Sequence, residues 1–357
     1  MFNHVDFDGH EKVLMVEDYE SGLKAIIALH STALGPAAGG CRLWSYESDT
    51  AALSDALRLS RGMSYKNAMA NLKMGGGKAV ILGPVAPTSR QGVFEAFGRA
   101  VESLDGQYIT AEDVGVSVTD MMTISRTTGY VSGIAGAEGR SGGDPSPYTA
   151  RGVRVGIEAA VRAKLGRSDL AGLKVAIQGL GHVGTFLCEE LFNLGARLYV
   201  ADINPERVSD CCDRFAAEPC SVDDILKQTV DVVAPCALGG AIDDEVAQYL
   251  QATIVAGAAN NQLKSASAGH WLAKRGILYA PDYVINAGGI IMVAGEISGD
   301  NDEVHIGEQV TAIGPRLADI FARAKSTDRP TFEVADSLAR EKIGNAIKAR
   351  RKFAEIA

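Results

Sequence analysis

Three charged side chains in the first third of the chain, Lys66, Lys78 and Asp113, are of the types that acid–base chemistry uses. Lys78 follows the glycines at 75–77, which let backbone or ligand come close to the lysine. A lysine that is stripped of water near a second cation gives up its proton more readily and can act as a general base. Lys66 could be that second cation or could bind a carboxylate, and Asp113 could take up a proton or pair with an ammonium. Each of them, taken alone, also fits an ordinary surface charge.

A glycine-rich segment in the middle of the chain has the spacing G-x-G-x-x-G, with Gly179, Gly181 and Gly184 at the fixed positions. It follows the apolar run 174–178, which we interpret as a buried strand, and precedes a helical pattern over 187–194. In that order the first glycine permits a tight turn, the second lets the backbone approach a pyrophosphate, and the third lets the helix pack close to the strand. The helix N-terminus adds N–H groups for the phosphates. The segment predicts a dinucleotide site, and the alternative is an ordinary glycine turn.

An acidic residue, Asp202, ends the next apolar run at 196–201. In a dinucleotide-binding βαβ unit, a carboxylate at this place accepts hydrogen bonds from the adenosine ribose hydroxyls. It would also repel a 2′-phosphate. The sequence therefore predicts NAD as the cofactor rather than NADP.

The elements that must position these residues alternate between strands and helices. The first part shows strands at 12–16, 23–29, 79–82 and 108–110, helices at 51–63 and 93–104, and a loop at 74–77 before Lys78. Later come a helix at 150–165 and strands at 230–234, 253–256 and 277–279, and the chain is mostly helical after 289. This alternation predicts an α/β protein with a largely parallel, doubly wound sheet of the Rossmann kind. The breaker segment 141–147 reads as a hinge between two domains.

Composition and charge exclude several classes of protein. The 357 residues are enough for two domains, and a net charge of −9 argues against nucleic acid or an anionic membrane surface as a partner. No apolar run is long enough to span a membrane, and no basic and then apolar leader is visible at the start. The six cysteines lack paired spacing and the six histidines form no ligand-like cluster. We therefore expect reduced thiols, a cytoplasmic location and no metal site.

A family resemblance rests on several separate motifs in the same order. They lie at 21–28, 34–40, 62–68, 75–78, 110–115, 256–263 and 281–289. Over almost its whole length the chain is similar to the glutamate/leucine/phenylalanine/valine dehydrogenase superfamily, nearest its leucine branch. The resemblance implies oxidative deamination of an L-amino acid to a 2-oxo acid and ammonia, with NAD as hydride acceptor.

The resemblance also implies roles for single residues. The lysine that matches Lys66 binds the substrate carboxylate, together with backbone around the positions of Gly39 and Gly40. The lysine that matches Lys78 is the general base that activates water, and the aspartate that matches Asp113 handles protons at the amino nitrogen. For the cofactor, the threonine that matches Thr149 contacts the nicotinamide amide, and the asparagine that matches Asn260 lies between substrate and nicotinamide.

Substrate preference depends on a pocket that, in the leucine branch, is lined by the positions of Ala38, Ala111, Ile290 and Val293. Leucine enzymes usually carry a larger residue where Ala38 stands, which favours aromatic substrates, whereas Ala111 resembles the leucine type. All four positions are apolar, so a second carboxylate on the substrate finds no cation there. A hydrophobic L-amino acid is predicted, with leucine, valine or isoleucine first and phenylalanine or tryptophan as the alternative.

The domain expectation is a substrate-binding and oligomerisation domain at 1–140 plus 326–357 and a Rossmann NAD-binding domain at 141–325. Family members are dimers to octamers, so a homo-oligomer is expected. A remote alternative is a sensor that binds NAD without catalysis. It would have no need of Lys78 and Asp113, and both are present.

Overall fold

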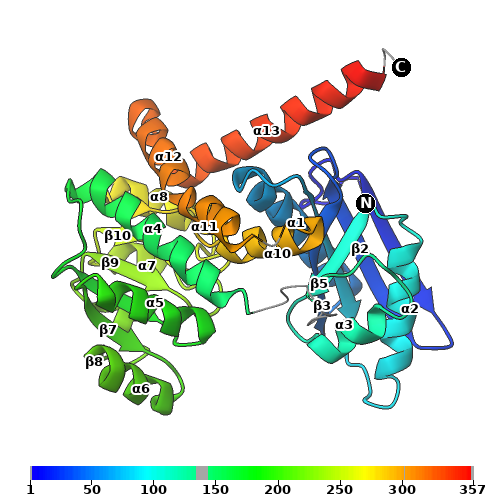
Figure 1. The fold of residues 1–357 in the computed structure, drawn as a ribbon, viewed down its shortest axis with the longest axis horizontal. Coiled ribbons are helices and arrows are strands. Elements are labelled where there is room, and N and C mark those ends of the chain that lie inside the picture. Colours follow the sequence, from blue (N-terminus) through cyan, green and yellow to red (C-terminus); the bar gives the residue numbers. More distant parts are fainter. Residues whose placement is uncertain (1, 134–143, 301, 355–357) are drawn as a thin grey trace. The chain divides into compact units, whose positions relative to one another are not determined.

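The structure, a computed structural model, describes residues 2–133, 144–300 and 302–354, and it falls into two compact units (Figure 1). Unit 1 comprises Met1–Gly143, Val293–Asn301 and Ala339–Ala357, and unit 2 comprises Asp144–Met292 and Asp302–Leu338. These bounds differ from the expected domains in two main places, since unit 1 includes Val293–Asn301 and unit 2 keeps residues up to Leu338. Residues 141–143 of the expected hinge lie outside the described residues.

Unit 1 is built on a five-stranded mixed sheet in the order β1-β2-β4-β3-β5. Strands β1 and β2 and strands β2 and β4 pair antiparallel, whereas β3 pairs parallel with both β4 and β5. The carboxyl ends of β3, β4 and β5 therefore meet at one edge. The strands are β1 (Lys12–Asp18), β2 (Leu23–Ser31), β3 (Ala37–Trp44), β4 (Gly75–Leu82) and β5 (Tyr108–Glu112).

Helices cover both faces of this sheet. Helix α1 (Asp49–Met69) packs on one face through a small apolar cluster that includes Ala56, Leu57 and Val80. Helices α2 (Arg90–Glu102) and α3 (Val118–Ile124) belong to the larger core on the other face. The α1 face has the smaller apolar cluster, and it is the face on which the polar residues described below gather.

Unit 2 contains a six-stranded sheet in the order β11-β10-β9-β6-β7-β8, and every pair in it is parallel. Counted along the chain from β6, this is the 3-2-1-4-5-6 order of a dinucleotide-binding fold. The strands are β6 (Lys174–Gln178), β7 (Arg197–Ala201), β8 (Glu218–Pro219), β9 (Val232–Pro235), β10 (Ile254–Val255) and β11 (Leu278–Tyr279).

Helices surround that sheet and continue to Ala354, the last residue that the structure describes. They are α4 (Ser146–Leu165), α5 (His182–Asn193), α6 (Pro205–Phe215), the 3₁₀ turn η1 (Ile225–Lys227), α7 (Asp244–Tyr249), α8 (Ala266–Lys274), α9 (Asp282–Ile285), α10 (Gly288–Ser298), α11 (Glu303–Thr311), α12 (Ile313–Thr327) and α13 (Thr331–Ala354). Among the described residues, no helix is long and apolar enough to cross a membrane.

The predicted fold class, α/β with a doubly wound parallel sheet, is confirmed. Two local predictions are wrong. The glycines at 75–77 belong to strand β4 rather than to a loop, and β3 lies at 37–44, where no strand is predicted. Glycines weaken a strand on average, but here they allow β4 to lie close to α1 and β2.

Candidate active site

Strand register places Ala38, Gly40, Lys78 and Ala111 on one face of the unit 1 sheet. Gly40 pairs with Ala111 across β3 and β5, and Lys78 pairs with Ala28 of β2, which contacts α1. Side chains on a strand alternate between faces, so Ala38, two residues before Gly40, points the same way. This is the α1 face of the sheet.

Glycine at position 40 makes room for two of the predicted catalytic side chains. A Cβ added at Gly40 would lie 2.8 Å from the Cβ of Asp113 and 3.3 Å from the Nζ of Lys78. At Gly76, in β4, an added Cβ would collide with the Ser64 backbone of α1. Backbone alone fits between these groups, so the helix, the lysine and the aspartate can all lie close to the strands.

Lys78 and Asp113 form a short ion pair, with 2.7 Å between the lysine Nζ and Oδ2 of the carboxylate. Lys78 is buried and Asp113 is about three-quarters buried. Burial alone would raise the pKa of Asp113, but the charges and hydrogen bonds of Lys78 and Arg42 outweigh it and lower the pKa below its ordinary value. Asp113 is therefore a carboxylate at neutral pH.

Arg42, Asp55 and Tyr46 extend this ion pair, and none of the three is predicted from the sequence as a site residue. Arg42 donates from Nε to Oδ2 of Asp113 at 3.0 Å and from Nη1 to Oδ2 of Asp55 at 2.9 Å. The Tyr46 hydroxyl donates to the same Asp55 oxygen at 2.7 Å. Arg42 is on β3, the strand that the sequence analysis misses, and its alternation with Gly40 is the signal that could have found it.

Lys66 lies in the last turn of α1, on the helix that covers this face. Met63, one turn earlier, comes within 3.3 Å of a Cβ added at Gly39. The C-terminal part of α13 holds this turn, since Arg340 Nε donates to the Tyr65 hydroxyl at 2.6 Å and Lys342 Nζ donates to the carbonyl of Ala68 at 3.2 Å. Lys66 is thus carried on a well-anchored helix end.

Unit 2 shows at its glycine fingerprint the spatial requirements expected for a dinucleotide. Gly179 has a positive φ of 96°, and an added Cβ would come within 2.7 Å of the backbone nitrogen of Ala237. A Cβ at Gly184 would collide with the carbonyl oxygen of Gly179, so this glycine sets the close helix–strand contact. Gly181 has nothing within 4 Å of an added Cβ. The space beside the backbone of Gly181 is therefore free, and Gly181 is the glycine that would face a pyrophosphate.

Asp202, at the end of β7, is held by the fingerprint itself. Its Oδ2 accepts a hydrogen bond from the backbone nitrogen of Leu180 at 2.6 Å, and its Oδ1 accepts one from that of Asn204 at 2.8 Å. The neighbouring Ile203 is 91% exposed. The carboxylate is fixed beside the turn at Gly179–Gly184, and the residues present fit the adenosine half of a nicotinamide dinucleotide.

The other predicted cofactor residues lie near the carboxyl edge of the same sheet. Asn260 accepts a hydrogen bond at Oδ1 from Nδ2 of Asn286 at 2.9 Å. Thr149 is in the first turn of α4, and a Cβ added at Gly289 would come within 2.7 Å of its Oγ1. The two segments that the resemblance assigns to the nicotinamide side are thus fixed within unit 2.

The four predicted pocket residues divide between strands and one helix. Ala38 is buried on β3, and Ala111 is half-buried on the neighbouring β5. Ile290 and Val293 are half-buried and stand three residues apart on α10. Cys41, next to Gly40 in the sequence, is fully buried in the core on the other face of the sheet.

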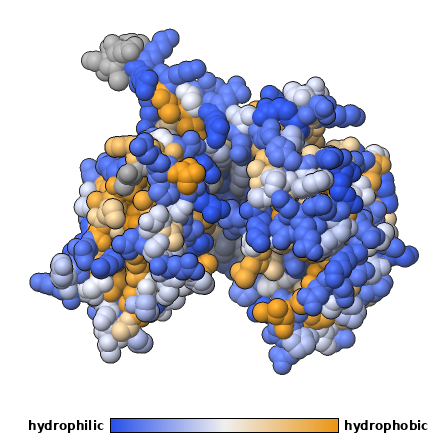
Figure 2. Space-filling model, turned by 180° about the vertical axis from the view of Figure 1, so that it is seen from behind, coloured by the Kyte–Doolittle hydropathy of each residue, from blue (hydrophilic) through white to orange (hydrophobic). Residues whose placement is uncertain are grey.

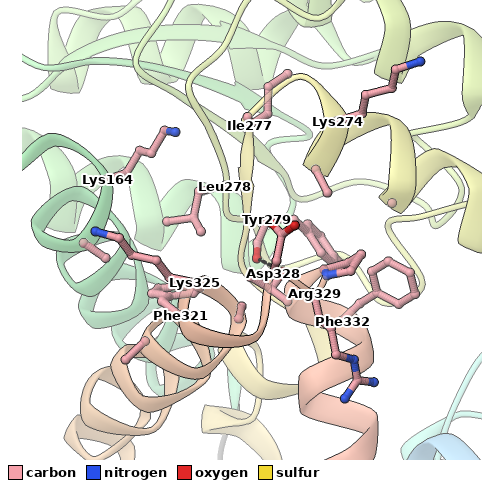
Figure 3. A pocket seen from close by; sticks show the side chains of 18 of the residues that line it. Lys164, Lys274, Ile277, Leu278, Tyr279, Phe321, Lys325, Asp328, Arg329 and Phe332 are labelled. Atoms are coloured by element: carbon pink, nitrogen blue, oxygen red, sulfur yellow. Dashed lines mark hydrogen bonds between the residues drawn. The ribbon is translucent and has the colours of Figure 1, made fainter.

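A cavity of about 800 Å³ in unit 2 contains none of the predicted site residues (Figure 3). Figure 3 shows Lys164 and Lys325 close to Leu278 of β11. Lys164, Lys274 and Lys325 stand in the last turns of α4, α8 and α12, where a cation complements the helix dipole. That role accounts for these lysines. No group of three or more metal-ligating side chains is found among the described residues.

Comparisons with known proteins place the chain in a family. Residues 10–130 match the family described as "Glu/Leu/Phe/Val dehydrogenase, dimerisation domain" and residues 204–350 match "Glutamate/Leucine/Phenylalanine/Valine dehydrogenase". A leucine dehydrogenase of Geobacillus stearothermophilus is 47% identical over 99% of this chain and 96% of its own length. A valine dehydrogenase of Streptomyces albus is 44% identical over 98% of this chain and 96% of its own length. The crystal structure of L-tryptophan dehydrogenase from Nostoc punctiforme matches with a TM-score of 0.85 and 44% identity, over 95% of this chain and 97% of the other.

Together the fold and these matches define the class as an oxidoreductase that acts on CH–NH₂ groups with a nicotinamide cofactor. The chain belongs to the glutamate/leucine/phenylalanine/valine dehydrogenase family, and it is an amino acid dehydrogenase. The resemblance drawn from the sequence motifs is confirmed.

Proposed function

We propose that this protein catalyses the NAD-dependent oxidative deamination of a hydrophobic L-amino acid to the 2-oxo acid and ammonia, and the reverse reductive amination. Leucine, valine and isoleucine are the favoured substrates. The observation that carries the proposal is the buried Lys78–Asp113 ion pair on a sheet face that also presents Ala38 and Ala111. Proton-transfer groups lie next to small apolar side chains there, and this suits an amino acid with an apolar side chain.

Each residue has a defined task in this proposal. Lys66 binds the substrate carboxylate, with backbone at Gly39 and Gly40. Asp113 takes a proton from the substrate ammonium, so that the neutral amine can lose hydride from Cα. Lys78 then removes a proton from the water that attacks the iminium carbon, and it can do so only after its own ammonium has lost a proton. Asp113 then returns its proton to the amino nitrogen of the resulting carbinolamine, the C–N bond breaks to release ammonia, and the hydroxyl loses its proton as the carbonyl of the 2-oxo acid forms.

For the cofactor we propose NAD. When it is bound, its nicotinamide ring supplies the hydride acceptor. Gly179, Gly181 and Gly184 would hold the pyrophosphate, and Asp202 would bind the ribose hydroxyls and disfavour a 2′-phosphate. Thr149 and Asn260 would hold the nicotinamide side.

A second candidate is an aromatic amino acid dehydrogenase. It is favoured by Ala38, which is small where leucine enzymes usually carry more bulk, and by the likeness to the tryptophan enzyme. The pocket side chains that distinguish leucine enzymes from aromatic ones differ in size by only a few methylene groups. Each methylene group is worth about 1–3 kcal/mol of discrimination between two substrates. The remote alternative, an NAD sensor, would bind the cofactor without turnover.

A substrate panel tests the proposal. Formation of NADH is followed with leucine, isoleucine, valine, phenylalanine, tryptophan and glutamate, and its consumption with the matching 2-oxo acids and ammonium. The highest kcat/KM is expected for a branched aliphatic substrate, and glutamate should be turned over poorly. The highest kcat/KM on an aromatic substrate would select the second candidate, and the absence of turnover would contradict both.

The base assignment is tested with Lys78→Ala. Loss of a general base should lower kcat by about 10²- to 10⁴-fold, while NAD binding changes little. The matched control is Lys24→Ala, since Lys24 is an exposed lysine on β2 of the same unit that pairs with Glu17 at 3.3 Å. The control should keep the kcat of the unmodified enzyme. Near-normal kcat in Lys78→Ala would rule out its role as the base.

We also propose a homo-oligomer formed through unit 1, in the cytoplasm. Unit 1 matches the domain described as a dimerisation domain. Its edge strand β1 exposes Met15, and Figure 2 shows apolar residues gathered on a face of this unit. The cytoplasmic location is supported by the six cysteines, all of which are free thiols. Light scattering coupled to gel filtration measures the oligomer, and a monomer at micromolar concentration would contradict it.

A further inference from the structure

We propose that Arg42 is a positioning residue of the reaction, which fixes the Asp113 carboxylate so that one of its oxygens is left for the substrate amino group. The inference rests on the proposed roles of Lys78 and Asp113. Arg42 acts through Asp113 and is not assigned a contact with the substrate.

The first argument is that only one of the two carboxylate oxygens of Asp113 is hydrogen-bonded by the described residues. Lys78 Nζ at 2.7 Å and Arg42 Nε at 3.0 Å both bind Oδ2 of Asp113. Among the residues that the structure describes, no hydrogen bond reaches Oδ1 of this carboxylate. Two donors from different strands on one oxygen fix the rotation of the carboxyl group, and the other oxygen remains to accept a proton from the substrate ammonium.

The second argument is that Arg42 is itself held in place. Its Nη1 donates to Asp55, on the second turn of α1, and the Tyr46 hydroxyl donates to the same Asp55 oxygen. A guanidinium is planar and carries its N–H groups in a fixed fork, so it can span two carboxylates with defined directions. A lysine at this position offers a single nitrogen whose donors rotate freely, so it could not hold the two carboxylates through two separate nitrogens in fixed directions.

The third argument is charge. Lys78, Arg42, Asp113 and Asp55 form a group with two positive and two negative charges, all buried or about three-quarters buried. Burial alone would lower the pKa of Arg42, but Asp113 and Asp55 outweigh it and raise the pKa. Arg42 therefore stays charged throughout the working pH range. It helps to keep Asp113 ionised, and Asp113 must be ionised before it can accept a proton.

The test compares Arg42→Ala with the unmodified enzyme on its best amino acid substrate. Misplacement of a reacting group should lower kcat by about 10- to 100-fold. Because a cation beside Asp113 is lost, the pKa of Asp113 should rise. Activity that needs the carboxylate is then lost at higher pH, and the acidic limb of the kcat/KM profile should move up by about one pH unit. Millimolar guanidinium should restore part of kcat, whereas urea, which has a similar shape and no charge, should not.

A matched control separates positioning from stability. Arg90 forms a two-point ion pair with Asp120 in the same unit, at 2.8 and 2.6 Å, outside the proposed site. Arg90→Ala should lower Tm but leave the acidic limb in place and show no response to guanidinium. If Arg42→Ala behaves in the same way as Arg90→Ala, the inference is wrong.

Arg42→Lys is a second variant that tests the same role, and it can replace Arg42→Ala if that variant folds poorly. It keeps a cation near Asp113 but removes the fixed two-nitrogen bridge between Asp113 and Asp55. The expected result is a fall in kcat of about tenfold or more with an acidic limb close to that of the unmodified enzyme. Unchanged kcat in Arg42→Lys would overturn the bridging role.

Failure of the inference can be told apart from failure of the proposed function. If Lys78→Ala abolishes turnover while both Arg42 variants keep it, only the inference fails. If the unmodified protein turns over no amino acid, the proposed function itself fails.

Discussion

The sharpest structural prediction concerns Gly40, where a single methyl group should separate the two proposed proton-transfer residues. In Gly40→Ala the new Cβ would stand 2.8 Å from the Cβ of Asp113 and 2.8 Å from the carbonyl oxygen of Glu112. Carbon atoms in contact prefer about 3.5–4.0 Å, so the neighbouring atoms must move by about 0.7–1.2 Å. The Glu112 oxygen is backbone of β5 and gives way poorly, so the displacement falls on Asp113 and on the Lys78 Nζ, 3.3 Å from the new atom.

The size of the effect follows from that displacement. Overpacking of this kind costs about 1–3 kcal/mol of stability. A shift of about 1 Å between reacting groups costs up to about 100-fold in rate. A looser pair with Lys78 also raises the pKa of Asp113, so the acidic limb of the kcat/KM profile should move to higher pH. We expect kcat to fall by about 10- to 100-fold.

The assay measures kcat and its pH dependence with the best substrate, and stability by urea unfolding. Gly62→Ala is the control, because Gly62 lies inside α1 and a Cβ there would meet nothing within 4 Å. This control should gain about 0.5–1 kcal/mol of stability, since alanine is the better helix former, and it should keep its kcat. If Gly40→Ala keeps full kcat and an unshifted acidic limb, the Lys78–Asp113 contact is not needed for the reaction.

Three further predictions address cofactor, specificity and stability. NAD should exceed NADP by at least about tenfold in kcat/KM, and Asp202→Ala should narrow that gap; equal use of both cofactors would contradict the assignment. Ala38→Leu should lower kcat/KM on phenylalanine relative to leucine by about 1–3 kcal/mol, and Ala111→Gly should act in the opposite sense; an unchanged ratio in both would show that they do not line the pocket. Burial lowers the pKa of His30 to about 4, so the unfolded chain binds the extra proton between pH 6.5 and 4. Stability should therefore fall over that range by about 3 kcal/mol through this residue, and urea unfolding of His30→Gln should show a smaller pH dependence.

The glycine fingerprint shows what is readable from sequence. The strand at Lys174–Gln178 is predicted with the observed bounds, and the reason for each glycine given by the motif agrees with the space around it in the structure. Two of these requirements are local, because the positive φ of Gly179 and the contact of Gly184 with the carbonyl oxygen of Gly179 involve one turn and the start of one helix. The space at Gly179 is also limited by Ala237, far along the chain, but the short motif is enough to predict the turn.

Strand β3 shows why other parts of the fold and of the site cannot be predicted from the sequence. Ala37–Trp44 contains two adjacent glycines and no β-branched residue, and this composition argues against a strand. The strand exists because β4 and β5 flank it on both sides. Those partners lie far away along the chain. Once β3 is missed, the alternation that brings Gly40 and Arg42 to the face of Lys78 cannot be seen, and Arg42 is lost from the predicted site.

Both units use glycine to let neighbouring groups approach the backbone closely. In unit 1 Gly40 leaves space in which Lys78 and Asp113 meet, and in unit 2 Gly184 brings the α5 N-terminus against the turn at Gly179. The two sites differ in what fixes their carboxylates. Asp202 is held by backbone N–H groups, which cannot be removed by a side-chain substitution, whereas Asp113 is held by Lys78 and Arg42. The carboxylate that we propose exchanges a proton is thus held by groups whose charge tunes its pKa, and substitutions around Asp113 should alter the pH profile more readily than substitutions around Asp202.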